Sequence, residues 1–170
     1  MIEFYGTKGP YGFLSNFYLK KILIAGKEWI CVESFYQAMK SLDADTQEKI
    51  RLASTPHQAL AMGRKVSLRG DWNDIVGTPD LAKIFEDKQG FVVERAKDHF
   101  MYYALIAKFT QNEDLKVAVL STGNEELIEI SPTDYYWGIG RKRTGENKLG
   151  RMLQLIRSKL HNCTSIEVEK

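Results

Sequence analysis

A short stretch near position 35 carries residue types that could do chemistry on a sugar. Glu33, Gln37 and Lys40 occur at i, i+4 and i+7 in a segment without Gly or Pro, so a helix would place them on one face. A carboxylate, an amide and an amine could hold a sugar hydroxyl, orient a water molecule and stabilise charge. An apolar stripe lies roughly opposite and consists of Val32, Phe35, Met39 and Leu42. Periodicity alone favours an ordinary solvated helix surface over a catalytic face.

A glycine-rich, basic segment at 134–150 is a second candidate. Gly138, Gly140 and Gly145 precede a predicted helix, and the cations nearby are Arg141, Lys142, Arg143, Lys148 and Arg151. Free N–H groups at a helix start attract anions, so a phosphate or diphosphate would fit. The glycine spacing matches neither the dinucleotide fingerprint nor the P-loop. A mobile basic surface loop is the alternative.

Two carboxylates stand beside tryptophans. Asp134 precedes Trp137 by three residues, and Asp71 directly precedes Trp72. Asp134 could act as a general base or accept a ribose hydroxyl, and the indole rings could stack on a base. Asn16, in a predicted loop, could bond a base edge or a sugar. Turn formation and core packing are the alternatives for these residues.

Composition excludes several function classes. The chain has 170 residues and a net charge of +2, which gives no electrostatic basis for general nucleic-acid binding. Cys31 and Cys163 form no CxxC pair, and the histidines show no HExxH spacing, so we expect no metal and no cofactor. There is no signal-peptide pattern and no apolar run of about 18 residues, which predicts a cytoplasmic protein without membrane association.

Hydrophobic periodicity predicts the elements that must position these groups. Strands are expected at 2–5 and 127–130, with a hairpin at 19–32, and the segment 114–120 fits a helix or a strand. Helices are expected at 33–42, 45–53, from Pro56 to about Gly63, 91–110 and 147–161. We therefore predict one α+β domain over residues 1–170, mostly helical with a small N-terminal β-hairpin or sheet.

These segments together resemble the NADAR family, which includes the YbiA-like N-glycosidases, over about residues 4–160. The resemblance rests on order and spacing of short motifs: Leu14-Ser15-Asn16-Phe17, Glu33 to Lys40, Ala61 to Arg64, Asp71-Trp72, Ala107-Lys108-Phe109, Ser121-Thr122-Gly123, Asp134 to Gly140, and Gly145 to Gly150. The sequence departs at Ser34, where the family usually has His.

The resemblance implies hydrolysis of a bond between ribose C1 and a nitrogen. Two substrate classes are implied: ADP-ribose attached to guanine, including ADP-ribosylated DNA, and phosphoribosylamino-pyrimidine intermediates of riboflavin synthesis. It implies Glu33, Lys40 and Asp134 as catalytic residues. Substrate-binding residues are expected to be Asn16, Gln37, Trp72, Trp137, Gly138, Arg141 and Asn147.

The chemistry leaves two routes open. A carboxylate such as Glu33 would stabilise the oxocarbenium character that builds at C1. Either water or the Lys40 amine then attacks, the latter giving a Schiff base. The amine route needs a neutral Lys40, which burial favours and a nearby Glu33 opposes. A module that binds ADP-ribose or a nucleotide without cleaving it is the alternative function. No pattern specifies an oligomeric state.

Overall fold

The structure is a computed structural model that describes residues 1–76, 86 and 90–168, with side chains up to residue 162. Contacts group the chain into two compact units. The first unit consists of Met1–Ser15 and Asn112–Lys170, and the second consists of Asn16–Gln111.

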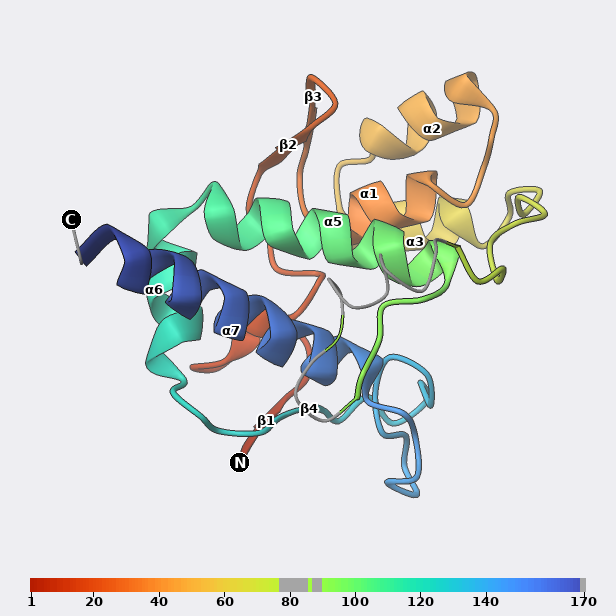
Figure 1. Ribbon diagram of the computed structural model, residues 1–170. Coiled ribbons are helices and arrows are strands. Elements are labelled where there is room, and N and C mark those ends of the chain that lie inside the picture. The colour runs from red at the N-terminus through yellow and green to blue at the C-terminus, as the bar shows by residue number, and fades with distance from the viewer. Residues whose placement is uncertain (77–85, 87–89, 169–170) are drawn as a thin grey trace. The chain divides into compact units, whose positions relative to one another are not determined.

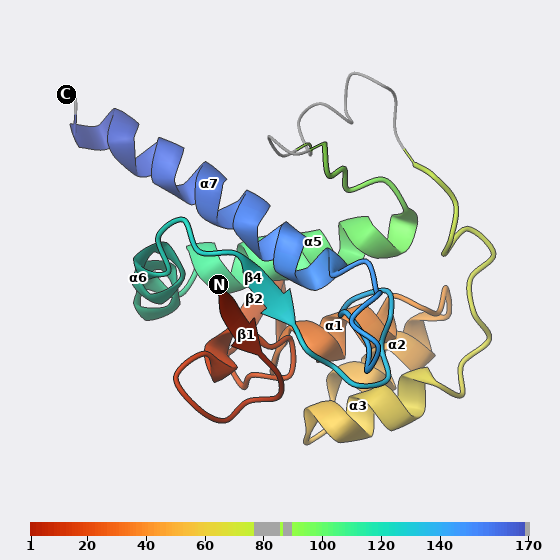
Figure 2. The same cartoon turned by 90° about the horizontal axis from the view of Figure 1, so that it is seen from below.

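In the first unit, two chain segments far apart in sequence form a parallel strand pair. Strand β1 (Ile2–Phe4) pairs with β4 (Leu127–Glu129), with Phe4 opposite Glu129. The pair is visible in Figure 2 with its two arrows side by side. Helix α7 (Lys148–Val168) packs against β4 and against α6 (Glu113–Ser121), and a 3₁₀ turn, η1, spans Gly12–Leu14.

The apolar stripe predicted for the last helix is the buried face of α7. Its side chains are all in the core: Leu149, Met152, Leu153, Ile156 and Leu160. Their spacing of three and four residues places them on one face, so burial of this face holds α7 against the strand pair.

The second unit is organised around α1 (Val32–Ala38), which packs against α2 (Ala44–Arg51), α3 (Pro56–Gly63) and α5 (Ala96–Thr110) (Figure 1). All seven residues of α1 are buried. Helix α3 begins as the sequence predicts, because Thr55 Oγ1 accepts the Gln58 N–H and Pro56 occupies the first turn.

The predicted hairpin is present but shorter. Strands β2 (Ile22–Ile24) and β3 (Lys27–Trp29) are antiparallel. Ala25 and Gly26 between them both have positive φ, at 51° and 74°. Positive φ at both central residues is the geometry of a two-residue turn that matches the twist of the strands.

The fold class is confirmed as mostly helical α+β, and several expected boundaries are corrected. Helix α1 ends at Ala38 and not at residue 42, and Leu42 is 71% exposed outside it. Helix α5 begins at Ala96 and not at 91, and the ambiguous segment 114–120 is helical. None of the described helices is long and apolar enough to cross a bilayer. The assignment of all 170 residues to one domain stays a prediction.

Candidate functional site

Glu33 is a buried carboxylate held by two side-chain amides. Its Oε1 accepts the Gln37 Nε2–H at 2.6 Å, and its Oε2 accepts the Asn16 Nδ2–H at 2.6 Å. The Glu33 backbone N–H also donates to the Asn16 carbonyl at 3.0 Å. Only 3% of the residue is exposed. Both oxygens accept N–H donors, which suits an ionised, acceptor-only carboxylate and fixes its orientation.

The polar face of α1 is therefore no solvated surface. Glu33 and Gln37 are buried at 3% and 2% exposure, on a helix whose apolar side chains are also buried. Burying a charge is costly unless hydrogen bonds compensate for lost hydration. The two amide donors supply such bonds, so this polar cluster has been built into the interior of the second unit.

Gly63 makes room for the amide of Gln37. A Cβ atom at position 63 would lie 2.1 Å from Gln37 Oε1 and 2.8 Å from Gln37 Cβ. Gln37 Oε1 is itself buried without a hydrogen-bond partner among the described residues. Because Gln37 Nε2 is bonded to Glu33, the glycine indirectly sets the position of the carboxylate.

Lys40 lies just beyond the end of α1, on a half-buried turn. Burial lowers the pKa of Lys40, the negative charge of Glu33 opposes this shift, and Arg64 adds to it. The net direction is downward, so desolvation outweighs the carboxylate. The Nζ atom lies 5.6 Å from the centre of the Tyr36 ring. The structure thus brings the amine within electrostatic reach of Glu33 and favours its neutral form.

Trp72 belongs to an aromatic cluster that reaches from Tyr36 to Phe100. Its ring is 5.1 Å from that of Tyr36 and stacks on Phe100 at 5.7 Å with an interplanar angle of 15°. Arg69 lies 4.9 Å from the Phe100 ring and pairs with Asp71. Trp72 is only 5% exposed, so one of its faces is already covered by protein.

Ser34, where the resembled family usually has His, serves the start of α1. Its hydroxyl donates to the Cys31 carbonyl at 2.8 Å and accepts the Cys31 N–H at 3.4 Å. Both residues are fully buried. The serine therefore closes the first turn of the helix that carries Glu33.

In the first unit, Asp134 organises a tight turn. Its Oδ1 accepts the backbone N–H groups of Tyr136 at 2.9 Å and Trp137 at 2.8 Å. The Trp137 ring meets the Tyr136 ring edge-on at 5.1 Å. Gly138 is buried, and a Cβ atom there would lie 2.7 Å from the Glu129 carbonyl oxygen. The turn alternative raised by the sequence thus holds for Asp134, whose second oxygen is not used by these two bonds.

The start of α7 does not offer the free N–H groups that the sequence analysis expected. The Lys148 and Leu149 N–H groups donate to the carbonyls of Tyr136 and Trp137, and the Asn147 N–H donates to that of Gly138. The segment folds back on itself and satisfies these donors. These three N–H groups are therefore not available to an anion.

The cations of this segment differ in availability. Arg141 and Lys142 are exposed, whereas Arg143 pairs with Glu3. Lys148 is 7% exposed, with Nζ 4.9 Å from the Tyr136 ring. The five positive charges counted in the sequence therefore do not form one open basic surface.

Asn147 joins the segment to β4. Its Oδ1 accepts the Glu129 N–H at 2.9 Å and its Nδ2 donates to the Leu127 carbonyl at 2.9 Å. Its φ is 51°, in the left-handed region that Asn tolerates better than most residues. These bonds account for its side-chain oxygen and one N–H, and its role in substrate binding stays a prediction.

Two ionisable residues were missed by sequence reasoning. Lys108 on α5 is 1% exposed, and burial lowers its pKa to about 7, with Cys31 opposing the shift. Glu129 on β4 is 7% exposed, and burial together with the charge of Asp134 raises its pKa to about 8. For Glu129, the available signal was a carboxylate inside the apolar run Leu-Ile-Glu-Ile.

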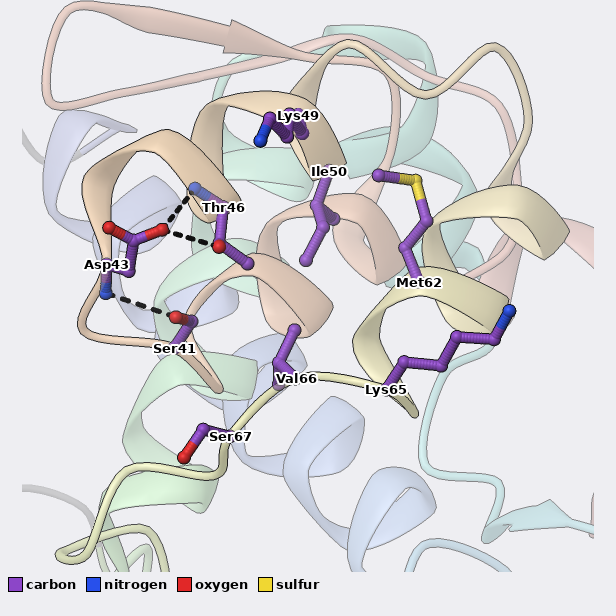
Figure 3. A pocket seen from close by; sticks show the side chains of 9 residues that line it. All are labelled: Ser41, Asp43, Thr46, Lys49, Ile50, Met62, Lys65, Val66 and Ser67. Atoms are coloured by element: carbon purple, nitrogen blue, oxygen red, sulfur yellow. Dashed lines mark hydrogen bonds between the residues drawn. The ribbon is translucent and has the colours of Figure 1, made fainter.

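A separate hollow lies on the second unit, between α2 and α3 (Figure 3). Its volume is about 400 Å³, and the side chains around it are Ser41, Asp43, Thr46, Lys49, Ile50, Met62, Lys65, Val66 and Ser67. Asp43 accepts the Thr46 N–H there as the cap of α2. None of the predicted site residues lines this hollow. Within the described residues, no group of three or more His, Cys, Asp or Glu residues could hold a metal ion.

The predicted site residues thus fall into two local groups. The structure brings Asn16, Glu33 and Gln37 into direct contact, with Lys40 in electrostatic reach and Trp72 linked to Lys40 through Tyr36. The other group lies in the segment that ends at α7 and consists of Asp134, Trp137, Gly138, Arg141 and Asn147.

Comparisons with known proteins match nearly the whole chain. A family model described as the NADAR domain matches residues 3–161. The N-glycosidase YbiA of Shigella flexneri serotype 5b is 36% identical over 162 residues, covering 94% of this chain and 88% of that protein. A riboflavin biosynthesis protein of Vibrio vulnificus is 34% identical over 161 residues, covering 94% of this chain and 38% of that protein.

A solved structure matches as well. The NMR structure of the Escherichia coli protein YbiA has a TM-score of 0.78 and 34% identity, and the match covers 96% of this chain and 86% of that one. The α+β fold is therefore shared with a protein of known structure.

Proposed function

The chain belongs to the NADAR family, and we propose that this N-glycosidase hydrolyses the bond between C1 of a phosphorylated ribose and a base or amine nitrogen. The observation that carries the proposal is the Glu33 cluster: a buried carboxylate fixed by two amides, with an amine of lowered pKa in electrostatic reach. A structural ion pair needs no such lowering of the lysine pKa, whereas a nucleophile does.

We assign Glu33 the role of stabilising positive charge at C1 as the C–N bond breaks. Asn16 and Gln37 hold both of its oxygens in place, so little reorganisation is needed when the charge develops. Lys40 supplies the amine that attacks C1 of the opened ribose. Asp134 accepts either a proton or a hydrogen bond from a ribose hydroxyl. Trp137 provides an aromatic surface on which the base stacks.

The substrate carries phosphate and is either an ADP-ribosyl-guanine or a phosphoribosylamino-pyrimidine of riboflavin synthesis. The similarity to a riboflavin biosynthesis protein of Vibrio vulnificus supports the second class. The exposed Arg141 and Lys142 support a negatively charged substrate in either case. Cytoplasmic location and the absence of a metal or cofactor requirement belong to the same proposal.

The test is product analysis with both substrate classes. Purified protein is incubated with ADP-ribosylated guanosine, ADP-ribosylated DNA and the phosphoribosylamino-pyrimidine, each with and without a chelator, and the released base is measured. Release from one class identifies the substrate. Tight binding of ADP-ribose without release from any of them would instead support the non-catalytic binding module.

A further inference from the structure

The Lys40 amine belongs to a residue two positions beyond Ala38, the last residue of α1, so contacts outside the helix must fix its position. We propose that Arg69, locked in place by Asp71, is the positioning residue that holds this amine for attack on C1. The inference rests on the proposed N-glycosidase function and its amine route. Arg69 acts through Lys40 and is not itself a catalytic residue.

The first contact that supports this role is to the backbone of Lys40. The Arg69 N–H donates to the Lys40 carbonyl at 2.8 Å, whereas the Lys40 N–H reaches the Gln37 carbonyl at 3.4 Å. A distance of 3.4 Å is long for an N–H···O bond, so the bond from Arg69 is the stronger of these two. The position of the segment that begins at Arg69 therefore sets where the lysine side chain starts.

Asp71 fixes the Arg69 side chain through two parallel bonds. Nε donates to Oδ1 at 2.6 Å and Nη2 donates to Oδ2 at 2.9 Å. A two-bond fork of this kind defines the orientation of both side chains. The Trp72 N–H donates to the Arg69 carbonyl at 3.3 Å, and the Lys97 N–H of α5 donates to the Trp72 carbonyl at 3.1 Å. The turn that holds Lys40 is thus closed on itself and anchored to α5.

The second contact leads from Arg69 to the amine end of Lys40. The guanidinium carbon of Arg69 lies 4.9 Å from the centre of the Phe100 ring, and this ring stacks on Trp72 at 5.7 Å. Trp72 lies 5.1 Å from the Tyr36 ring, whose centre is 5.6 Å from Lys40 Nζ. Arg69 therefore contacts the lysine backbone directly and supports, through three rings, the aromatic face beside its amine.

Arg69 and Asp71 place the amine, while other charges act on its protonation. The charged groups that act on Lys40 are Glu33 of α1 and Arg64 at the end of α3, and burial, which lowers the pKa of Lys40, outweighs the opposing effect of Glu33. Loss of the fork should let the amine move toward solvent. The pKa of Lys40 should then rise toward that of an ordinary lysine, because less of the amine is desolvated.

The experiment compares Arg69→Lys with Arg51→Lys. Arg69→Lys keeps the positive charge and the backbone N–H but cannot form the fork. Arg51 makes the same kind of fork with Glu48 on α2, through Nε at 2.9 Å and Nη2 at 2.6 Å, and is therefore the matched control. Both pairs are partly exposed, and exposed ion pairs contribute little to stability, so both variants should melt close to the wild type.

Turnover should distinguish the two variants. A displacement of about 1 Å in a reacting group can cost about 10²-fold in rate, so we expect kcat of Arg69→Lys to fall by about 10–100-fold and KM to change by less than about 3-fold. The pH at which turnover rises should move upward, because the released amine is less buried. Asp71→Asn should change kcat and this pH in the same directions, and Arg51→Lys should change neither.

Competitive labelling with acetic anhydride measures the effect on Lys40 without a substrate. The fraction of Lys40 that is acetylated at each pH, read by mass spectrometry, gives its titration, and the exposed Lys49 serves as an internal reference. In the wild type, Lys40 should titrate below Lys49, because burial lowers its pKa. In Arg69→Lys, the titration of Lys40 should move toward that of Lys49.

Three results would overturn the assignment of Arg69. These are an unchanged kcat in folded Arg69→Lys, an unchanged Lys40 titration in the same variant, and equal losses of turnover in Arg69→Lys and Arg51→Lys. If the wild-type protein releases no base from any substrate, the proposed function fails, and the labelling alone then decides whether Arg69 holds the amine.

Discussion

Glu33 and Glu129, two buried carboxylates among the described residues, have opposite surroundings. Glu33, in the second unit, accepts a hydrogen bond from a side-chain amide at each oxygen. Glu129, in the first unit, has the like charge of Asp134 beside it, and its pKa is raised to about 8. The same side chain is thus prepared to bind positive charge in one unit and to hold a proton in the other. The environment, more than the residue type, decides the chemistry.

The largest expected effect is at the charge-binding carboxylate. Glu33→Gln keeps the size of the side chain and removes its charge, so turnover should fall by about 10²–10³-fold, while the melting temperature changes little. Steady-state kinetics and thermal unfolding measure the two quantities. Glu28→Gln, an exposed change in a surface ion pair, serves as the control and should leave both unchanged. Near wild-type turnover in Glu33→Gln would remove the carboxylate from the mechanism.

Lys40→Ala should be comparably damaging, because the proposed nucleophile is lost. Lys49→Ala, an exposed lysine on α2, is its control. Since burial lowers the pKa of Lys40, turnover by the amine route should rise with pH at a lower pH than an ordinary lysine would require. An active Lys40→Ala variant would contradict the assignment.

Borohydride reduction during turnover identifies the amine directly. A Schiff base at Lys40 should leave substrate-derived mass on the peptide that contains it. Lys108 also has a lowered pKa, about 7, and is the natural comparison within the same unit. Substrate-derived mass on Lys108 would identify this lysine of α5 as the nucleophile. Mass on neither lysine would favour direct attack by water.

Substitutions of Trp72 and Trp137 should have different effects, one mainly on stability and the other mainly on substrate binding. Trp72→Ala removes a ring stacked in the core of the second unit, so the free energy of unfolding should drop by about 3–5 kcal/mol. Trp137 is half-buried beside the Asp134 turn, so Trp137→Ala should weaken substrate binding by about 10-fold or more with a smaller loss of stability. Denaturant unfolding and binding titration distinguish these outcomes. The reverse pattern would make Trp72 the stacking surface.

Gly63→Ala tests the positioning of Glu33 without touching it. The added methyl group would overlap Gln37 Oε1, so the free energy of unfolding should decrease by about 1–3 kcal/mol and turnover should also decrease. Gly70→Ala is the matched control, because a Cβ atom there meets nothing within 4 Å. Combining Gly63→Ala with Gln37→Ala removes the overlap with the amide but leaves the two Cβ atoms 2.8 Å apart, so stability should recover only in part and turnover should not recover. A stable, fully active Gly63→Ala would show that the amide can move freely.

Much of this arrangement was predictable from local patterns. The Thr55-Pro56 cap, the spacing of the last helix and the shared face of Glu33 and Gln37 each depend on a few neighbouring residues. The parallel pairing of β1 with β4 was not, because it joins residues more than 120 positions apart in the chain. Burial of α1 on all sides, and the raised pKa of Glu129, likewise depend on packing and on the charge of Asp134.

The smallest expected effect concerns the exposed cations near α7. The sequence suggested backbone N–H groups and several cations as a phosphate site, but the N–H groups of Lys148 and Leu149 are already bonded and Arg143 is paired with Glu3. The exposed side chains of Arg141 and Lys142 still offer positive charge to an anion. Exposed charges in water contribute modestly to binding and are screened by salt.

The double change Arg141→Gln and Lys142→Gln should therefore raise KM by only about 2–5-fold at low ionic strength and leave kcat unchanged. As salt is added, the KM of the variant should approach that of the wild type. Lys116→Gln, which changes a half-buried lysine of α6 paired with Glu113, is the control. If KM changes neither with the double substitution nor with the salt concentration, other residues recognise the phosphate.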